Sequence, residues 1–531
     1  MPPGASNAVP ERIAALDAGL RITEVMYHPA EDADYEYVEL KNVGAVPLEL
    51  GGVRLSGGIE FSFPEMILAP GQYVLAVRDL GAFYHRYGPG ANVAGQYSGN
   101  LDNSGEQIAL QLPAPYDAAI LRFQYSNLWY PQTAGQGRAL ASADPSLPPS
   151  AWSQPASWLP GVVDGGSPGR ADGQSLAPQV IISEVLAHTD PPLVDAVELH
   201  NLTDEPIDIT GWYLSDSLEN LKKYRVPAEK GLIPAGGFAL FTEADFNPNP
   251  QNPGPNDFSF NSAYGDQVWL SAADAEGNIT RTVDYVEFGP TANGETVARF
   301  TSTEGRWYVY PAASRTLGTA NTGPRVGPQV VITELMYCHA LTRAADDLEY
   351  IELYNPTATA IDLAHWSLGT GERPWENLVL DFSTLPVQRR TIQPGQTLVV
   401  LSFDPWDAAN AARWQKFRTT YGIIATDPIG FVGGYSGHFS DSGELVRLHS
   451  PDNPQANQPG YYPPLAHDEL RYRAAWGAYA TGESLHRVAL RRWGDEPQSW
   501  IAAAPSPGRV AAMVVGQYIF YNNSVLDGRT P

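Results

Sequence analysis

One phrase occurs three times along the 531 residues, and this repetition constrains the fold more than any other feature. The phrase reads LRITEVMYHP, VIISEVLAHT and VVITELMYCH, and its acid lies at Glu24, Glu184 and Glu334. The three acids are 160 and 150 residues apart, which is the length of a whole domain and not of a solenoid repeat. The chain is therefore predicted to contain three tandem copies of one domain.

Further phrases follow in the same order within each copy, and they alternate as strands do. The next one reads EYVELKN, DAVELHN and EYIELYN. In its first copy Val38 and Leu40 fall on one face of the predicted strand, and Tyr37 and Glu39 fall on the other. Turns with Pro and Gly, such as LAPGQYVLAV, then join apolar runs. Many short strands bounded by turns predict a β-sandwich.

Helical spacing occurs in two places only, in AFYHRYG around Phe83 and in DAANAARWQKFRTTYG from Asp407. The second copy has the loop NPNPQNPGPND at the corresponding point. A helix that one copy replaces by a loop is not part of the shared core. The predicted fold class is therefore all-β, with minor helical insertions.

The order of the phrases resembles that of the bacterial lamin tail domain family. The residues that carry the resemblance are ITEVMY, EYVELKN, GWYLSDS, PGQ, YSGNLDNSGE and GGSPGR. The first copy departs from the pattern at Val53, where the other two have Trp212 and Trp366. The resemblance implies an immunoglobulin-like β-sandwich, without catalytic residues, in a secreted or cell-surface multidomain protein.

The predicted domains follow from where the phrases begin and end. We expect three lamin-tail-like sandwiches over residues 20–172, 179–324 and 328–510, of which the second is the most divergent. Residues 1–19 are predicted to be an N-terminal linker, and residues 511–531 the start of a truncated further segment. The connections between sandwiches are short, so neighbouring sandwiches are expected to touch and to form a semi-rigid rod.

Charge and composition exclude several classes of function. The formal net charge of -26 disfavours nucleic acid as a partner. A single cysteine, Cys338, excludes an intrachain disulfide and a cysteine-based zinc site. No apolar run approaches the roughly 18 residues of a membrane span. The first residues do not form a secretory signal, so the chain is expected to be intracellular or an internal piece with its signal upstream; the family resemblance favours an extracellular or cell-surface location.

Each copy carries two acids and one asparagine as its strongest candidate site. The nine residues are Glu24, Glu39, Asn42, Glu184, Glu198, Asn201, Glu334, Glu352 and Asn355. Paired carboxylates can act as acid and base, and with an Asn carbonyl they can hold calcium. Alternatively, the first acid, which is expected to share a strand face with Ile22 and Met26, accepts hydrogen bonds from local donors while the asparagine caps a turn.

The structural interpretation is preferred, because a fold determinant must recur in every copy whereas an active site is needed once. No catalytic, cofactor-binding or metal residue is therefore predicted, and calcium is the one cofactor kept as an alternative.

Other polar and aromatic groups have competing interpretations. The acidic turns Asp102–Glu106 and Asp441–Glu444 lack the spacing of a calcium loop and are read as turns. One histidine lies near the end of each opening phrase, and Cys338 precedes the histidine of the third. These residues could form a zinc site or a nucleophile, or they could be loop histidines and an inert thiol. The aromatic clusters either stack on a ligand or plug the sandwiches. The residues concerned are His28, His188, His339, Tyr125, Trp129, Tyr130, Trp476 and Tyr479.

The sequence contains no phosphate-binding loop, nucleophile elbow or H-E-x-x-H motif at a fitting position. We therefore predict a non-catalytic extracellular or cell-surface module that acts as a spacer, or that binds a protein or a cell-surface polysaccharide. The alternative is a secreted hydrolase whose carboxylates lie in one repeat or in a neighbouring domain.

Overall fold

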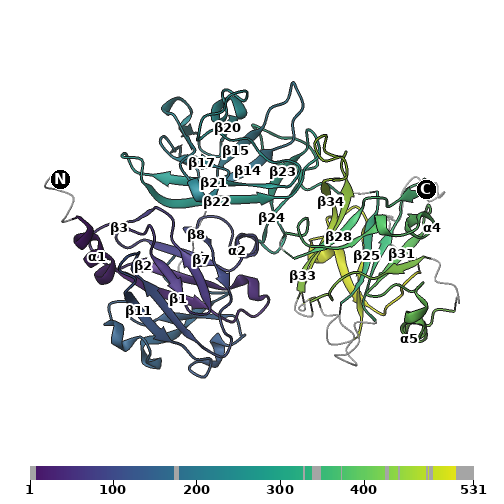
Figure 1. Cartoon of the computed structure of the whole chain (residues 1–531), viewed down its shortest axis with the longest axis horizontal. Coiled ribbons are helices and arrows are strands. Elements are labelled where there is room, and N and C mark those ends of the chain that lie inside the picture. The colour runs from purple at the N-terminus through teal and green to yellow at the C-terminus, as the bar shows by residue number, and fades with distance from the viewer. Residues whose placement is uncertain are drawn as a thin grey trace, which may run out of the picture. The chain divides into compact units, whose positions relative to one another are not determined.

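The computed structural model divides the chain into two compact units, one of which holds the first two repeats and the other most of the third (Figure 1). It describes residues 8–172, 179–326, 329–337, 348–371, 373–424, 430–440, 443–473, 476 and 482–509. These residues form an all-β fold of three two-sheet sandwiches with a few short helices.

The first repeat consists of a six-stranded sheet, β13-β12-β1-β2-β7-β8, and a five-stranded sheet, β11-β10-β4-β5-β9, beside the two-stranded pair β3-β6. Its elements are α1 (Ala8–Gly19), β1 (Leu20–Met26), β2 (Tyr37–Asn42), β3 (Leu48–Glu49), β4 (Arg54–Ser56), β5 (Ile59–Ser62), β6 (Ile67–Leu68), β7 (Tyr73–Val77), α2 (Leu80–Tyr87), β8 (Val93–Gln96), β9 (Ser98–Gly99), β10 (Gln107–Gln111), β11 (Ala119–Gln124), β12 (Arg138–Ser142) and β13 (Trp158–Asp164). The sequence predicts a linker over residues 1–19, but α1 lies within it and Leu16 belongs to the core.

The second repeat has a five-stranded sheet, β20-β15-β14-β23-β24, a four-stranded sheet, β18-β17-β21-β22, and the pair β16-β19. Its elements are β14 (Val180–Leu186), β15 (Ala196–Asn201), β16 (Ile207–Asp208), β17 (Tyr213–Ser215), β18 (Tyr224–Arg225), β19 (Leu232–Ile233), β20 (Phe238–Thr242), α3 (Glu243–Phe246), β21 (Asp266–Ala273), β22 (Ile279–Phe288), β23 (Thr296–Thr301) and β24 (Trp307–Pro311).

The third repeat returns to the plan of the first, with a six-stranded sheet, β32-β31-β26-β25-β35-β36, a four-stranded sheet, β29-β28-β33-β34, and the pair β27-β30. Its elements are β25 (Val331–Met336), β26 (Tyr350–Tyr354), β27 (Ile361–Asp362), β28 (Ser367–Thr370), β29 (Leu378–Asp381), α4 (Val387–Arg390), β30 (Thr391–Ile392), β31 (Thr397–Leu401), α5 (Ala411–Tyr421), β32 (Phe431–Gly433), β33 (Gly443–Pro451), β34 (Pro464–Arg473), β35 (Ser484–Arg487) and β36 (Trp500–Ala503).

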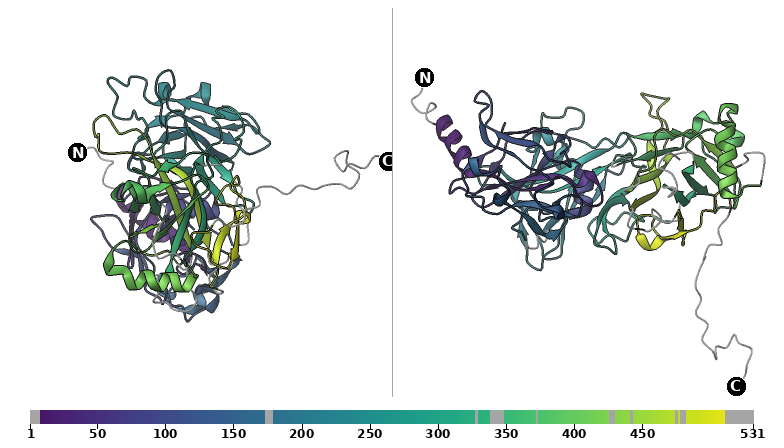
Figure 2. Two further views of the ribbon diagram at one scale, coloured as in Figure 1. Left: turned by 90° about the vertical axis from the view of Figure 1, so that its right-hand side faces the viewer. Right: turned by 90° about the horizontal axis from the view of Figure 1, so that it is seen from below.

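The helical insertions lie where the sequence places them. Helix α2 occupies the first repeat and α5 the third, whereas the second has only the four-residue α3. Figure 2 shows α5, in green, on the outside of the third repeat. Its Trp414 and Phe417 form a second apolar cluster with Met336 and Tyr350, on the sheet face that points away from the core.

A β-bulge in the first strand of every repeat reverses one expectation. The register shifts between Ile22 and Glu24, and at the equivalent positions of the other two repeats. In the third repeat Ile332 and Leu335 lie in the core between the sheets, while Met336 lies in the outer cluster. The prediction that the first acid shares a face with Ile22 was therefore wrong, because the extra residue turns the acid to the outer face.

The first two sandwiches touch, as their short connection predicts. Strand β22 contacts α2 and β8 of the first repeat. The rings of Tyr84 and Tyr285 are 5.5 Å apart, and the N–H of Thr282 donates to the side-chain oxygen of Asn92 at 2.9 Å. Strand β22 is therefore covered on both faces, which explains why most of its residues are buried.

Candidate functional site

The two acids of each repeat are cross-strand neighbours on the outer face of the first sheet. Glu24 pairs with Glu39, Glu184 with Glu198 and Glu334 with Glu352. All six side chains are buried, with at most 2% of their surface exposed. The structure thus brings together the paired carboxylates that the sequence predicts.

The asparagine of each set does not join the acids. Asn42 lies at the end of β2, where its side-chain amide donates to the carbonyls of Val46 and Leu68 at 2.8 Å. Its oxygen accepts from the N–H of Gly44 at 2.9 Å. Asn201 and Asn355 make the same turn contacts. The asparagine therefore closes the turn after the strand and is not available as a ligand beside the acids.

In the first repeat the acids bind the main chain of the closing segment, here the residues that follow the last strand. Glu24 accepts from the N–H of Ser167 at 3.0 Å, and Glu39 accepts from the N–H of Gly169 at 2.7 Å. The donors lie 143 and 130 residues away along the chain. They are thus not the local donors that the sequence suggested.

The same contacts recur in the other repeats. Glu184 accepts from the N–H of Thr316 at 3.0 Å, and Glu198 from that of Gly318. In the third repeat, Ser506 and Gly508 each donate their N–H at 2.9 Å, the first to Glu334 and the second to Glu352. In each repeat, one carboxylate pair therefore ties the first two strands to the closing segment.

Hydroxyl groups occupy further lone pairs of these acids. Thr23 donates to Glu39 at 2.6 Å, and Thr333 donates to Glu352 at 2.9 Å. Glu334 also accepts from the hydroxyl of Tyr350 and from that of Ser484. A carboxylate that is removed from water needs such donors, because an unsatisfied buried polar group is costly.

Burial changes the acidity of the second acid in each pair. Burial, assisted by the negative charge of Glu334, raises the pKa of Glu352 to about 8. Burial also raises the pKa of Glu198 to about 7 and that of Glu39 well above its usual range. One member of each pair is therefore partly or fully protonated near neutral pH. Such a pKa suits a general acid, but these carboxyls are buried behind the closing segment.

The raised pKa of Glu352 predicts a pH dependence of stability. Its folded pKa of about 8 lies above the ordinary value of 4.5. Between pH 4.5 and pH 8 the folded chain therefore holds a proton on Glu352 that the unfolded chain has released. The free energy of unfolding is therefore expected to fall as the pH rises from 4.5 to 8, by up to about 1.4 kcal/mol per pH unit. Urea unfolding of the third repeat at pH 5, 6, 7 and 8 measures this slope.

Glu352→Gln should flatten that slope, because the amide does not titrate. Glu376→Gln, at a largely exposed acid of the same repeat, is the matched control and should leave it unchanged. Equal slopes in the wild type and in Glu352→Gln would contradict the assignment.

The third repeat adds a serine and a histidine to its acid pair. Ser484 Oγ lies 2.9 Å from His486 Nε2, which is 3.3 Å from Glu334 and 3.1 Å from the carbonyl of Ala504. A catalytic relay uses one ring nitrogen for the nucleophile and the other for the acid. Here a single nitrogen faces both groups, and Ser484 is fully buried. The arrangement resembles a structural hydrogen-bond cluster more than a nucleophile.

Sequence reasoning missed several buried ion pairs, and two of them lie at matching places in the second and third repeats. Asp284 binds Arg299 at 2.8 Å, and Asp468 binds Arg487 at 2.5 Å. Each acid also accepts the N–H of an isoleucine in the first strand of its repeat. The sequence does contain a signal for these pairs. An acid and an arginine occupy matching positions in the second and third copies, and each lies within an apolar run. In the first repeat the strand register places Leu121 at the position of the acid and Ser142 at the position of the arginine.

The remaining candidates are accounted for where the structure describes them. In the turn Asp102–Glu106, Asp102 accepts from the N–H of Ser104 at 2.7 Å, as a turn does. Tyr125 is buried against Tyr27, with ring centres 4.7 Å apart. Half-buried side chains pack on the apolar cores at Trp129, Tyr130 and Trp476. Cys338, His339, Asp441 and Tyr479 lie outside the described residues.

Neither a metal cluster nor a membrane span is found in the described part of the chain. No three side chains of His, Cys, Asp or Glu gather there in a way that could hold a metal ion. His188 lies beside the carbonyl of Thr291, at 2.8 Å. Within the same ranges, no helix has the length and apolar character needed to cross a membrane.

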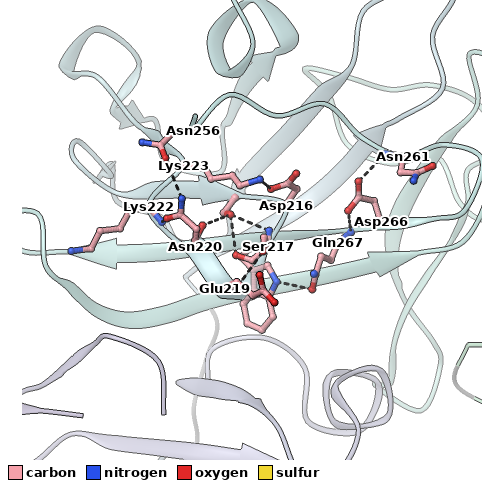
Figure 3. A network of polar contacts seen from close by, with 12 residues as sticks. Asp216, Ser217, Glu219, Asn220, Lys222, Lys223, Asn256, Asn261, Asp266 and Gln267 are labelled. Carbon is pink, nitrogen blue, oxygen red and sulfur yellow. Dashed lines mark hydrogen bonds and ion pairs between the residues drawn. The ribbon is translucent and has the colours of Figure 1, made fainter. Parts of the chain in front are cut away.

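A further polar network occurs in the second repeat, after β17 (Figure 3). Ser215 donates to the carbonyl of Asn220 at 2.7 Å, and Lys223 binds Asp216 at 2.5 Å. The amide of Asn220 reaches Asn256 at 3.1 Å. The network connects the loop after β17 to the loop before β21.

The comparison with protein-family models agrees with this architecture. The family model described as Lamin Tail Domain matches residues 14–126, 174–301 and 324–457. No curated protein matches the chain. Among solved structures, the crystal structure of a DUF4876 family protein from Bacteroides thetaiotaomicron matches with 11% identity, over 44% of this chain and 84% of that chain, at a TM-score of 0.19. Since the three matched regions cover more than half of its length, this chain belongs to the lamin tail domain family and carries three tandem copies of its immunoglobulin-like domain.

Proposed function

We propose that the chain is a non-catalytic spacer segment of a larger secreted or cell-surface protein. One observation carries this proposal: in all three repeats the paired acids are buried and bind the repeat's own closing segment. This recurring acid pair thus holds the fold together. Triplication of a fold determinant is expected in a spacer, whereas an enzyme needs one site.

The contact between the first two sandwiches supports the same role. A spacer sets the distance between its neighbours only if its domains are coupled. Trp269 and Tyr285 of the second repeat belong to the same apolar cluster as the core of the first. These two sandwiches therefore share buried surface and are not joined by the chain alone.

The family and the charge support the proposed location and partner. An extracellular or cell-surface location is what the family resemblance favours. The net charge of -26 argues against nucleic acid. A protein or a cell-surface polysaccharide is the proposed partner, and no cofactor is required.

A hydrolase is the second candidate, because only the third repeat places a serine and a histidine beside its acid pair. At the histidine position the other repeats have Ala141 and Ala298. The burial of Ser484 and the use of one imidazole nitrogen for both contacts make this candidate weaker.

Coupling of the first two sandwiches tests the spacer. Hydrogen exchange in increasing urea should give one common midpoint for peptides from β10 and β21, because the shared interface makes both sandwiches unfold together. Tyr285→Ala removes the ring that contacts Tyr84 and Trp269, so it should separate the midpoints. Val197→Ala, in the core of the second sandwich, should lower both together. Separate midpoints in the wild type would refute the coupling.

A further inference from the structure

In the first and third repeats a short parallel strand covers the edge of the first sheet. Strand β8 pairs with β7, and β32 pairs with β31. Leu75 donates its N–H to the carbonyl of Asn92 at 2.9 Å, and Val399 donates its N–H to that of Gly430 at 2.9 Å. The covering strands therefore satisfy main-chain groups that a bare edge would leave open.

In the second repeat the corresponding edge is β20, which pairs with β15 alone in the described part of the chain. Asn201 donates to the carbonyl of Gly237 at 2.9 Å, and antiparallel alternation then turns the N–H and the carbonyl of Leu240 away from β15. Leu240 is 38% exposed, whereas its counterparts Leu75 and Val399 are fully buried. An uncovered edge of this kind accepts another strand.

The segment that follows β20 does not supply the missing cover. The corresponding segment forms α2 and β8 in the first repeat, and α5 and β32 in the third. In the second repeat, residues 247–257 read NPNPQNPGPND, and residues 248–256 are all exposed. Proline lacks the N–H that a strand donates to its neighbour. The second repeat thus keeps the edge strand but lacks its cover.

The two existing covers indicate which kind of strand fits this edge. Strand β8 begins VAG, and β32 reads FVG. A Cβ on Gly433 would overlap the carbonyl oxygens of Leu401 and Phe403. Thr242 holds the place of Leu401 in the register of the second repeat. A strand on β20 is therefore expected to carry two apolar residues followed by glycine.

A second copy of β20 does not meet this requirement. Residues 238–242 read FALFT and contain no glycine. Two-fold symmetry would also bring a second β20 to the edge in the antiparallel direction, whereas both existing covers run parallel to the strand they cover. The existing covers therefore favour a different strand as the occupant.

We propose that the free edge of β20 binds an extended segment of a partner protein, which joins the sheet as a parallel strand with the pattern apolar, apolar, glycine. A carbonyl of that segment accepts the N–H of Leu240, as the carbonyl of Asn92 accepts that of Leu75. Main-chain hydrogen bonds supply the affinity, and the glycine supplies the specificity. The inference goes beyond the spacer role and does not rest on it, because the edge is bare whether or not the sandwiches unfold together.

A synthetic peptide with the sequence of residues 91–98, ANVAGQYS, is the probe, because it contains the cover of the first repeat. Amide hydrogen exchange is measured at Leu240 in the 531-residue chain. Peptide at about ten times its Kd should slow this exchange about ten-fold, since the amide exchanges from the unbound fraction. The amide of Leu75, which β8 already covers, should not change. The same peptide with Gly95→Ile should give no protection at Leu240.

Variants of the edge show whether the peptide binds through the main chain. Leu240→Pro removes the open N–H and should weaken binding of the fluorescently labelled peptide at least about ten-fold. Leu240→Ala keeps the N–H and is the matched control; its affinity should stay within about three-fold of the wild type. Thermal unfolding of each variant checks that the second repeat is intact. The peptide with Gly95→Ile tests specificity on the unaltered chain, so the test does not depend on the variants alone.

Three results would overturn the proposal. The first is exchange at Leu240 that is already slow before the peptide is added, because the edge would then be occupied. The second is exchange that the peptide does not slow, or that the Gly95→Ile peptide slows equally. The third is a concentration-dependent dimer of the chain that Leu240→Pro abolishes, because the occupant would then be a second copy.

Discussion

Arg487→Ser is expected to lower the free energy of unfolding of the third repeat by about 3–5 kcal/mol, because it leaves Asp468 buried without its cation. Arg487 and Asp468 are both almost completely inaccessible to solvent, and they contact each other at 2.5 Å. Burial already raises the pKa of Asp468, and Arg487 counteracts that rise. Without the arginine, the acid retains the N–H of Ile332 as a hydrogen-bond donor. Urea unfolding, monitored by the hydrogen exchange of amides in β34, measures the loss of stability.

The first repeat supplies the matched control for this prediction. It has Leu121 and Ser142 at the positions of the acid and the arginine. The double variant Asp468→Leu/Arg487→Ser copies that solution and should recover most of the lost stability, because replacing a buried ion pair by apolar contact is often neutral. If the double variant were less stable than Arg487→Ser, the third repeat would not tolerate the leucine and serine that the first repeat has at these positions.

Glu334→Ala should destabilise the third repeat by more than about 2 kcal/mol, because several buried donors lose their acceptor at about 1–3 kcal/mol each. The donors are the hydroxyls of Tyr350 and Ser484 and the N–H of Ser506. Glu334→Gln keeps an oxygen for these donors and turns its amide toward the hydroxyl of Ser506, so it should cost little. Thermal unfolding of the full chain compares the two variants.

The same pair of variants separates the structural role from the alternatives. Excess calcium should leave the wild-type midpoint unchanged; a strong rise that Glu334→Gln abolishes would indicate a metal site instead. A wild-type hydrolytic activity toward polysaccharide that Glu334→Gln removes without loss of stability would indicate the hydrolase.

The sequence was sufficient for the architecture because local patterns determine it. The repeated phrases, the alternation in EYVELKN and the turns with Pro and Gly each depend on neighbouring residues, and the structure confirms the all-β fold and the three copies. The dispensable helices were visible for the same reason, since one copy lacks their helical spacing.

The contacts of the site could not be predicted, since they depend on residues far apart in the chain. The bulge before Glu24 exists only relative to the partner strand, so the face of that acid could not be read from alternation. The donor Ser167 comes from 143 residues further on. Asp468 and Arg487 lie on different strands, and no short motif connects them.

The link between first strand and closing segment has a mechanical consequence. A pulling force along a tandem array enters each repeat at its first strand and leaves through its last residues. In all three repeats the carboxylates bind these two places directly. Tension is therefore carried across a short junction of charge-assisted hydrogen bonds, and the hairpins between them bear little of it until that junction breaks.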